Sequence, residues 1–233
     1  RWPTDVAYLE ALVTLTTAAA VTSRVRLGTA VLVLPLRQPV LLAKQAASLD
    51  VLAGGRLVLG VGTGWLREEF AALGVPFERR GRLTSSAIEV LRDCWTGRPA
   101  ERTTGDHPVP GGLLVLPVPE RPVPLLVGGH SPAALRRAGV LGDGWLAQQS
   151  VADLDPDALG REIAQVRAHA DEVGRDPAAL RVVLRVADSL GRCAEVAARV
   201  PALLAAGVHE VVVDTDPTGD PEADLVLLRA AAG

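Results

Sequence analysis

Two glycine-rich turns contain the residues of this sequence best suited to hold a ligand. The first runs from Gly62 to Trp65 (GTGW) after a run of aliphatic residues, and the second runs from Gly128 to Ser131 (GGHS) before Pro132. Glycine lets the backbone pass close to a ligand, and the N–H groups at a helix start favour an anion such as phosphate. Each turn alone is also typical of an ordinary connection between a strand and a capped helix. Together they predict a phosphate-bearing ligand, provided that both turns face one opening.

Three further polar residues are candidates for contact with a ligand. His130 could donate a proton, because an imidazole changes charge near neutral pH, although a solvated histidine or a helix-start hydrogen bond fits equally well. Arg37 follows a predicted strand and could bind an anion or pair with a helix carboxylate. His107 lies in the loop 98–121, where we expect it to be exposed. No spacing of His, Cys, Asp or Glu predicts a metal site.

The composition excludes several classes of function. The chain has 233 residues, 48% hydrophobic residues and a formal net charge of −3, with no block of like charge that would attract nucleic acid or an anionic membrane. No apolar run reaches the roughly 20 residues needed to cross a bilayer. Cys94 and Cys193 belong to no cysteine motif, which suits a reducing compartment. We therefore expect a cytoplasmic protein that acts on a small molecule.

The elements that must position the two turns alternate regularly. Strands are predicted at 24–34, 56–61, 123–127, 144–147, 181–187 and 210–214. Helices are predicted at 6–22, 39–53, 65–73, 82–95, 132–141, 157–173, 193–206 and 221–232, the first with Thr4 and Asp5 at its N-cap. Such alternation predicts a parallel sheet with right-handed crossovers, either an open sheet or a closed barrel. In both, ligands bind at the carboxyl ends of the strands.

The opening helix has no strand of its own. A closed barrel needs eight strands, so in that fold two strands and a helix would precede Arg1. We treat residues 1–233 as a single domain. The Pro- and Gly-rich stretch 98–121 is long for a connection and is a candidate lid or substrate loop.

Three blocks of the sequence resemble the luciferase-like monooxygenase family, and most closely its actinobacterial branch that uses the 5-deazaflavin coenzyme F420. They are Ser23–Phe70, with LGT, AKQAASLD, GGR and LGVGTGW; Leu91–Gly97 (LRDCWTG); and Val123–Trp145, with GGHSPAAL and GDGW. The resemblance implies an α/β fold of the (β/α)8-barrel type, with the first two strands missing from this chain. It implies an oxidoreductase that transfers a hydride between F420 (8-hydroxy-5-deazaflavin) and a small organic substrate, commonly as a homodimer. The alternatives are an FMN-dependent monooxygenase of the same fold and a non-catalytic homologue.

The resemblance also implies a cofactor site. Family members often have a bulge with a non-prolyl cis peptide behind the cofactor ring, and this falls at Thr29–Val31. The implied cofactor-binding residues are Thr29, Ala30, Val31, Gly62, Thr63, Gly64, Trp65, Gly128, Gly129, His130 and Ser131, with Arg37 as the substrate or anion candidate. Trp65 stands where some sugar-phosphate dehydrogenases of the family have Glu, which argues against that activity. The family's usual cofactor-contacting acid or His falls on the missing strands, so His130 is the only catalytic candidate here.

Overall fold

The computed structural model describes residues 8–215 and 221–232. The chain divides into two compact units, residues 1–125 and 126–233, and each is described by itself. The predicted cap at Thr4 and Asp5 lies outside the described residues. The first helix begins later than predicted, at Ala11, because Glu10 caps it by accepting a hydrogen bond from the Val13 backbone N–H.

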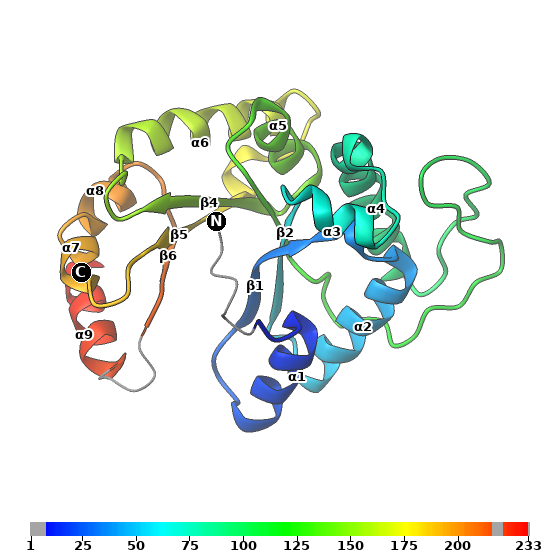
Figure 1. The fold of residues 1–233 in the computed structure, drawn as a ribbon, viewed down its shortest axis with the longest axis horizontal. Helices are drawn as coiled ribbons and strands as arrows, with labels where there is room; N and C mark the ends of the chain where they lie inside the picture. Colours follow the sequence, from blue (N-terminus) through cyan, green and yellow to red (C-terminus); the bar gives the residue numbers. More distant parts are fainter. Residues whose placement is uncertain (1–7, 216–220, 233) are drawn as a thin grey trace. The chain divides into compact units, whose positions relative to one another are not determined.

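Unit 1 contains two parallel strands with helices packed beside them (Figure 1). Its elements are α1 (Ala11–Val21), β1 (Leu27–Val33), η1 (Leu34–Leu36), α2 (Pro39–Leu52), β2 (Leu57–Gly62), α3 (Arg67–Ala72), η2 (Phe77–Arg79) and α4 (Arg80–Cys94). The buried indole of Trp95 joins two of these helices, since its Nε1–H donates to the Ala43 carbonyl at 3.1 Å. Arg56 joins the end of α1 to the start of β2, because its guanidinium donates to the Thr22 and Val25 carbonyls.

An irregularity interrupts β1. Thr29 pairs with Leu59 and Leu32 pairs with Val61, so two residues of β1 face one residue of β2, as in a β-bulge. The Ala30–Val31 peptide inside this bulge is cis. Both the bulge and the cis peptide were expected at this place from the family resemblance, and both are confirmed. The buried Thr29 hydroxyl donates to the Gly60 carbonyl at 2.7 Å and ties the bulge to β2.

Unit 2 contains four parallel strands that follow one another in chain order, with helices along one face (Figure 1). Its elements are β3 (Leu125–Gly128), α5 (Pro132–Leu141), β4 (Gly144–Ser150), α6 (Pro156–Asp171), η3 (Pro177–Ala179), β5 (Arg181–Ala187), α7 (Cys193–Ala197), α8 (Val200–Ala205), β6 (Glu210–Val213) and α9 (Pro221–Ala232). The helix-facing side is closely packed, and Trp145, Val182 and Leu184 are almost completely buried.

All six predicted strands are present, but some boundaries were wrong. Helix α3 begins at Arg67 instead of Trp65, because Trp65 stays in the extended loop after the glycines. The predicted helix 193–206 is two short helices, and Pro201 stands in the first turn of the second one. Strand β4 extends to Ser150 instead of ending at residue 147. This extension adds polar residues to the carboxyl end of the sheet.

The candidate lid 98–121 is held against α4. Arg102 and Val109 exchange two backbone hydrogen bonds, of 2.9 and 3.0 Å, and so form a small hairpin. At its tip the Asp106 carboxylate forms an ion pair with Arg82 at 2.7 Å and a second ion pair with a neighbouring arginine. Any movement of this segment as a lid would have to break these ion pairs.

His107, next to the hairpin tip, is less exposed than expected. Its Nδ1 is buried and has no hydrogen-bond partner among the described residues. Burial lowers the pKa of His107, and the charges of Arg102 and Arg79 lower it further against the opposing effect of Asp106. The neutral imidazole is therefore the form that this position favours.

Candidate cofactor and substrate site

The bulge of β1 and the Gly62–Trp65 turn lie in contact in unit 1. A methyl group added at Gly62 would lie 2.7 Å from Cγ2 of Val31. At Gly64, which has φ +76°, an added methyl would lie 2.6 Å from Cγ1 of Val33. Both glycines are therefore required by the packing of the protein itself. The side chain of Val31 remains 40% exposed, which is unusual for an aliphatic residue in a parallel strand.

The electrostatics of this first turn do not suit a phosphate. Helix α3 has only six residues, and its first turn contains Glu68 and Glu69. Two carboxylates at this end compensate the helix dipole and repel an anion. Trp65, 60% exposed, adds apolar surface in the same loop. This part of unit 1 is thus better suited to a flat apolar ring than to a charged group.

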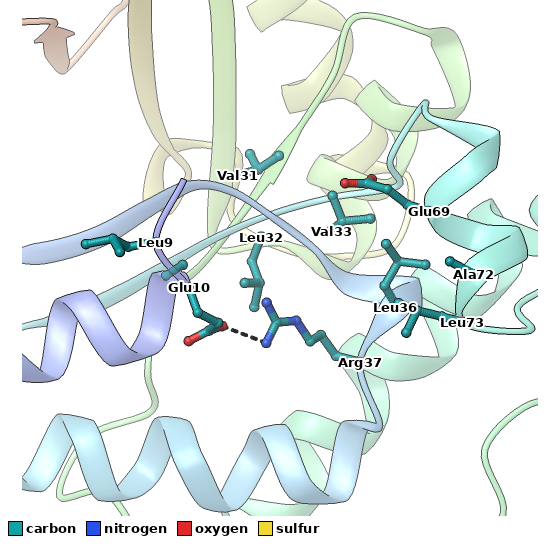
Figure 2. A pocket seen from close by; sticks show the side chains of 11 residues that line it. Leu9, Glu10, Val31, Leu32, Val33, Leu36, Arg37, Glu69, Ala72 and Leu73 are labelled. Carbon is teal, nitrogen blue, oxygen red and sulfur yellow. Dashed lines mark ion pairs between the residues drawn. The ribbon is translucent and has the colours of Figure 1, made fainter. Parts of the chain in front are cut away.

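A pocket of about 610 Å³ opens beside the carboxyl end of β1. It lies between the first residues of α1, the bulge of β1, the segment that follows β1, and α3 (Figure 2). The lining is apolar apart from Glu10, Arg37 and Glu69. The exposed Val31 belongs to this lining, so the pocket adjoins the bulge.

Arg37, the predicted anion-binding residue, lies in this pocket and is paired within the protein. Its Nη1 lies 2.7 Å from Oε1 of Glu10, the N-cap residue of α1 (Figure 2). Burial alone would raise the pKa of Glu10, but the hydrogen bond from Val13 N–H and the charge of Arg37 together lower it. Of the two interpretations left open for Arg37, the structure shows the pairing with a helix carboxylate.

The second turn, Gly128–Ser131, lies at the carboxyl end of β3 in unit 2. Ser131 caps α5 as expected, because its hydroxyl accepts a hydrogen bond from the Ala134 N–H. Helix α5 has ten residues, Pro132 in its first turn and no acidic residue there. Unlike α3, helix α5 has no acidic residue in its own first turn.

Both ring nitrogens of His130 are engaged by the protein. Nδ1 lies 2.9 Å from the Glu162 carboxylate, and Nε2 lies 3.1 Å from the Gln148 backbone nitrogen and 2.8 Å from its carbonyl. The ring also packs edge-to-face on Trp145 at 5.3 Å. In either protonation state the imidazole has partners on both sides. These contacts position the turn against β4 and α6.

Sequence reasoning missed a polar row at the carboxyl ends of β4, β5 and β6. It comprises Gln148, Arg185 and Asp214, which are linked through the Arg185 guanidinium. The available signal was the arginine inside the otherwise apolar strand sequence RVVLRVA, since a charge in such a strand needs a partner. Glu10 and Glu162, which pair with two of the predicted site residues, were also missed.

The residues that the structure describes contain no group of three or more His, Cys, Asp or Glu side chains placed to bind a metal ion. Among those same residues, no helix combines the length and the apolar character that a membrane span requires.

The chain is similar to known proteins both as a member of a family and in single relatives. The family model described as luciferase-like monooxygenase matches residues 1–219. An uncharacterized protein of Mycobacterium tuberculosis is 42% identical over 168 residues, covering 72% of this chain and 56% of the relative. An F420-dependent glucose-6-phosphate dehydrogenase of Kineococcus radiotolerans is 41% identical over 143 residues, covering 58% of this chain and 41% of the relative. The chain thus spans about half the length of these relatives.

Solved structures with the same fold include two enzymes that use F420. An F420-dependent secondary alcohol dehydrogenase with an F420–acetone adduct matches with a TM-score of 0.83 and 17% identity, over 99% of this chain and 86% of that one. The F420-dependent tetrahydromethanopterin reductase of Methanopyrus kandleri matches with a TM-score of 0.76 and 19% identity, over 96% and 86%. These matches support the α/β-barrel fold over the open sheet, with six strands among the described residues in place of eight.

Proposed function

Because the chain belongs to the luciferase-like monooxygenase family, we propose that it is an oxidoreductase that binds coenzyme F420 and transfers a hydride between F420 and a small organic substrate. A relative at 41% identity and two structures of the same fold are named as F420-dependent enzymes. These names describe those proteins and support the choice of F420 over FMN for this one.

One observation from the structure supports the proposal most directly. The bulge of β1 presents the exposed side chain of Val31 beside the Gly62–Trp65 turn, at the end of the strands where barrel enzymes bind ligands. A planar deazaflavin or flavin ring needs such an apolar backing surface, and Val31 is 40% exposed here. The residues of unit 1 therefore fit the ring of the cofactor.

The phosphate of the cofactor fits unit 2 better than unit 1. The side chains of Val31 and Val33 occupy the space beside Gly62 and Gly64. The two glutamates at the start of α3 repel an anion. The start of α5 after Gly128–Ser131 has no acidic residue, so its backbone N–H groups and dipole favour a negative charge. Of the two turns, the second therefore has the electrostatics better suited to a phosphate.

The protein's own contribution to the reaction is to hold the substrate and exclude water. When bound, F420 supplies the hydride chemistry. The apolar pocket beside Val31, with its Glu10–Arg37 pair, suits a small, largely apolar molecule that has a polar group. A sugar phosphate fits this lining poorly, in keeping with Trp65 in place of the family's Glu. The homodimer inferred from the resemblance remains part of the proposal, and light scattering would test it.

Titration of the purified protein with F420 and with FMN, followed by cofactor fluorescence, tests the proposal. We expect saturable binding of F420, and Val31→Glu should weaken it by about tenfold or more, because a carboxylate would be buried under the ring. Val25→Glu, at an exposed position before β1, is the matched control and should bind like the wild type. Binding of FMN alone would favour the monooxygenase alternative, and binding of neither cofactor would favour the non-catalytic one.

A further inference from the structure

Strand β5 has one face that the helices cover, and an opposite face that is buried at Val183 but partly exposed at Arg185. Val182, Leu184 and Val186 are at most 1% exposed on the face that the helices cover. Side chains alternate along a strand, so Arg185 points to the opposite face. Its register partners there, Gln148 on β4 and Val212 on β6, are both exposed. An arginine therefore stands on the helix-free face of the sheet, in the carboxyl half of its strand.

The guanidinium of Arg185 is clamped from both sides. Nη1 donates to Oε1 of Gln148 at 3.1 Å, and Nη2 donates to Oδ1 of Asp214 at 3.2 Å. Asp214 is itself held, since its backbone N–H donates to the Ser189 hydroxyl at 2.7 Å. Partners on two neighbouring strands orient the planar group and reduce the entropy that it would lose on binding a ligand.

The clamp does not use the whole guanidinium. An arginine has five N–H donors, and the two hydrogen bonds to described residues leave three of them. The side chain is 21% exposed, so these donors are partly desolvated but reachable. Because Asp214 balances the positive charge of Arg185, the binding of an anion would depend on directed hydrogen bonds from the guanidinium to the oxygens of that anion. A phosphate or carboxylate has the oxygen geometry that a guanidinium matches.

The Arg185 row is continuous with the second glycine turn. Gln148, which holds Arg185 through its side chain, contacts the His130 ring through its backbone at 3.1 Å. The helix start after Gly128–Ser131 and the clamped guanidinium thus occupy the same carboxyl edge of unit 2. We infer that Arg185 is an anion-binding residue, which holds a phosphate or carboxylate oxygen of a ligand at this edge. That the ligand is F420 or its substrate rests on the proposed function.

The same strand provides a matched control. Arg181 is on the same face at the amino end of β5, and it too faces a carboxylate on β6, because its Nη2 lies 3.6 Å from Glu210. If both arginines serve only to pair with a nearby carboxylate, then Arg181→Gln and Arg185→Gln should have the same effect on ligand affinity. If Arg185 binds a ligand, only its replacement should change binding. Arg185→Lys retains the positive charge but loses the planar guanidinium, which can donate two parallel hydrogen bonds to one anion.

The test is calorimetric titration of wild type, Arg185→Gln, Arg185→Lys and Arg181→Gln, with thermal unfolding as the check on folding. The probes are pyrophosphate, F420 and the truncated deazaflavin that lacks the phosphate-bearing side chain. We expect Arg185→Gln to weaken pyrophosphate binding about 10- to 100-fold, with Arg185→Lys between it and the wild type. Arg181→Gln should bind like the wild type.

The cofactor probes identify the source of the anion. A loss by Arg185→Gln that is seen with F420 but not with the truncated compound assigns the contact to the cofactor side chain. Unchanged F420 affinity with weakened pyrophosphate binding to the F420-loaded protein assigns it to the substrate. If the wild type binds pyrophosphate but not F420, the proposed function fails while this inference stands. Equal affinities of the folded Arg185 and Arg181 variants for every probe overturn the inference, as does a wild type that binds no probe.

Discussion

The side chain of Val31 lies directly over the α-carbon of Gly62, where an added methyl group would be 2.7 Å from Cγ2 of the valine. This contact joins the bulge of β1 to the turn after β2. It explains why glycine occurs in the GTGW turn without any reference to a ligand. The turn serves as the support of the bulge, and the exposed face of Val31 is the surface that a ligand would meet.

Replacing Gly62 with Ala should therefore destabilise the protein. Overpacking of this kind costs about 1–3 kcal/mol, because the neighbouring backbone or side chain must shift. The double variant Gly62→Ala/Val31→Ala should recover most of this loss, since it removes the colliding methyl group. Denaturant midpoints measure both effects. Gly160→Ala, at a helical position where the added methyl makes only an ordinary contact at 3.9 Å, is the control and should not destabilise. No recovery in the double variant would contradict the packing argument.

Substitution of Arg56 should strongly lower the stability of unit 1. The Arg56 guanidinium donates to the carbonyls of Ala53, Val25 and Thr22, which include the end of α1. Arg56→Met leaves these acceptors without their charged donor and should lower the free energy of unfolding by about 2–4 kcal/mol. Arg56→Lys should recover little, because a single ammonium cannot reach all three. Arg24→Met, at an exposed position, should have almost no effect.

The hairpin within 98–121 should open when its tip is released. Asp106→Asn removes the charge that holds Arg82 and should raise the population of the open hairpin. Trypsin cleavage after Arg102 measures this population. Glu68→Gln, an equal change of charge on exposed α3, should leave the cleavage rate unchanged. Equal rates for both variants would show that the ion pairs do not hold the hairpin.

The same hairpin should open more readily in mild acid. Burial, the largest cause, lowers the folded-state pKa of His107 below the ordinary value of about 6.5. The stability that the neutral imidazole contributes is therefore fully present above about pH 6.5 and is lost as the pH falls toward the lowered folded-state pKa. Trypsin is poorly active there, so amide hydrogen exchange across 98–121 between pH 7 and 5 is the measurement. His107→Phe should flatten the pH dependence after correction for intrinsic exchange, and an unchanged slope would exclude His107 as its source.

The alternation of strands and helices, and the two turns at the ends of strands, followed from the sequence alone. These features depend on the periodicity of apolar residues and on Gly, Pro and Ser at element boundaries, and both are local properties of the chain. The resemblance to the family added the bulge at Thr29–Val31, which no periodicity indicates. The start of α3 was placed two residues too early, because Trp65 lies in the loop before the helix.

The roles of the polar side chains were decided only by the tertiary structure. Arg37 was compatible with an anion or a carboxylate until folding brought Glu10 to within 2.7 Å, and the ring nitrogens of His130 had no identifiable partners until folding brought Glu162 and Gln148 to them. Arg185 was an isolated charge in an apolar strand until Gln148 and Asp214 clamped it. The energy of a polar group depends on the partners that surround it in space. Those partners come from distant parts of the chain, so a local pattern can identify the group but cannot determine its use.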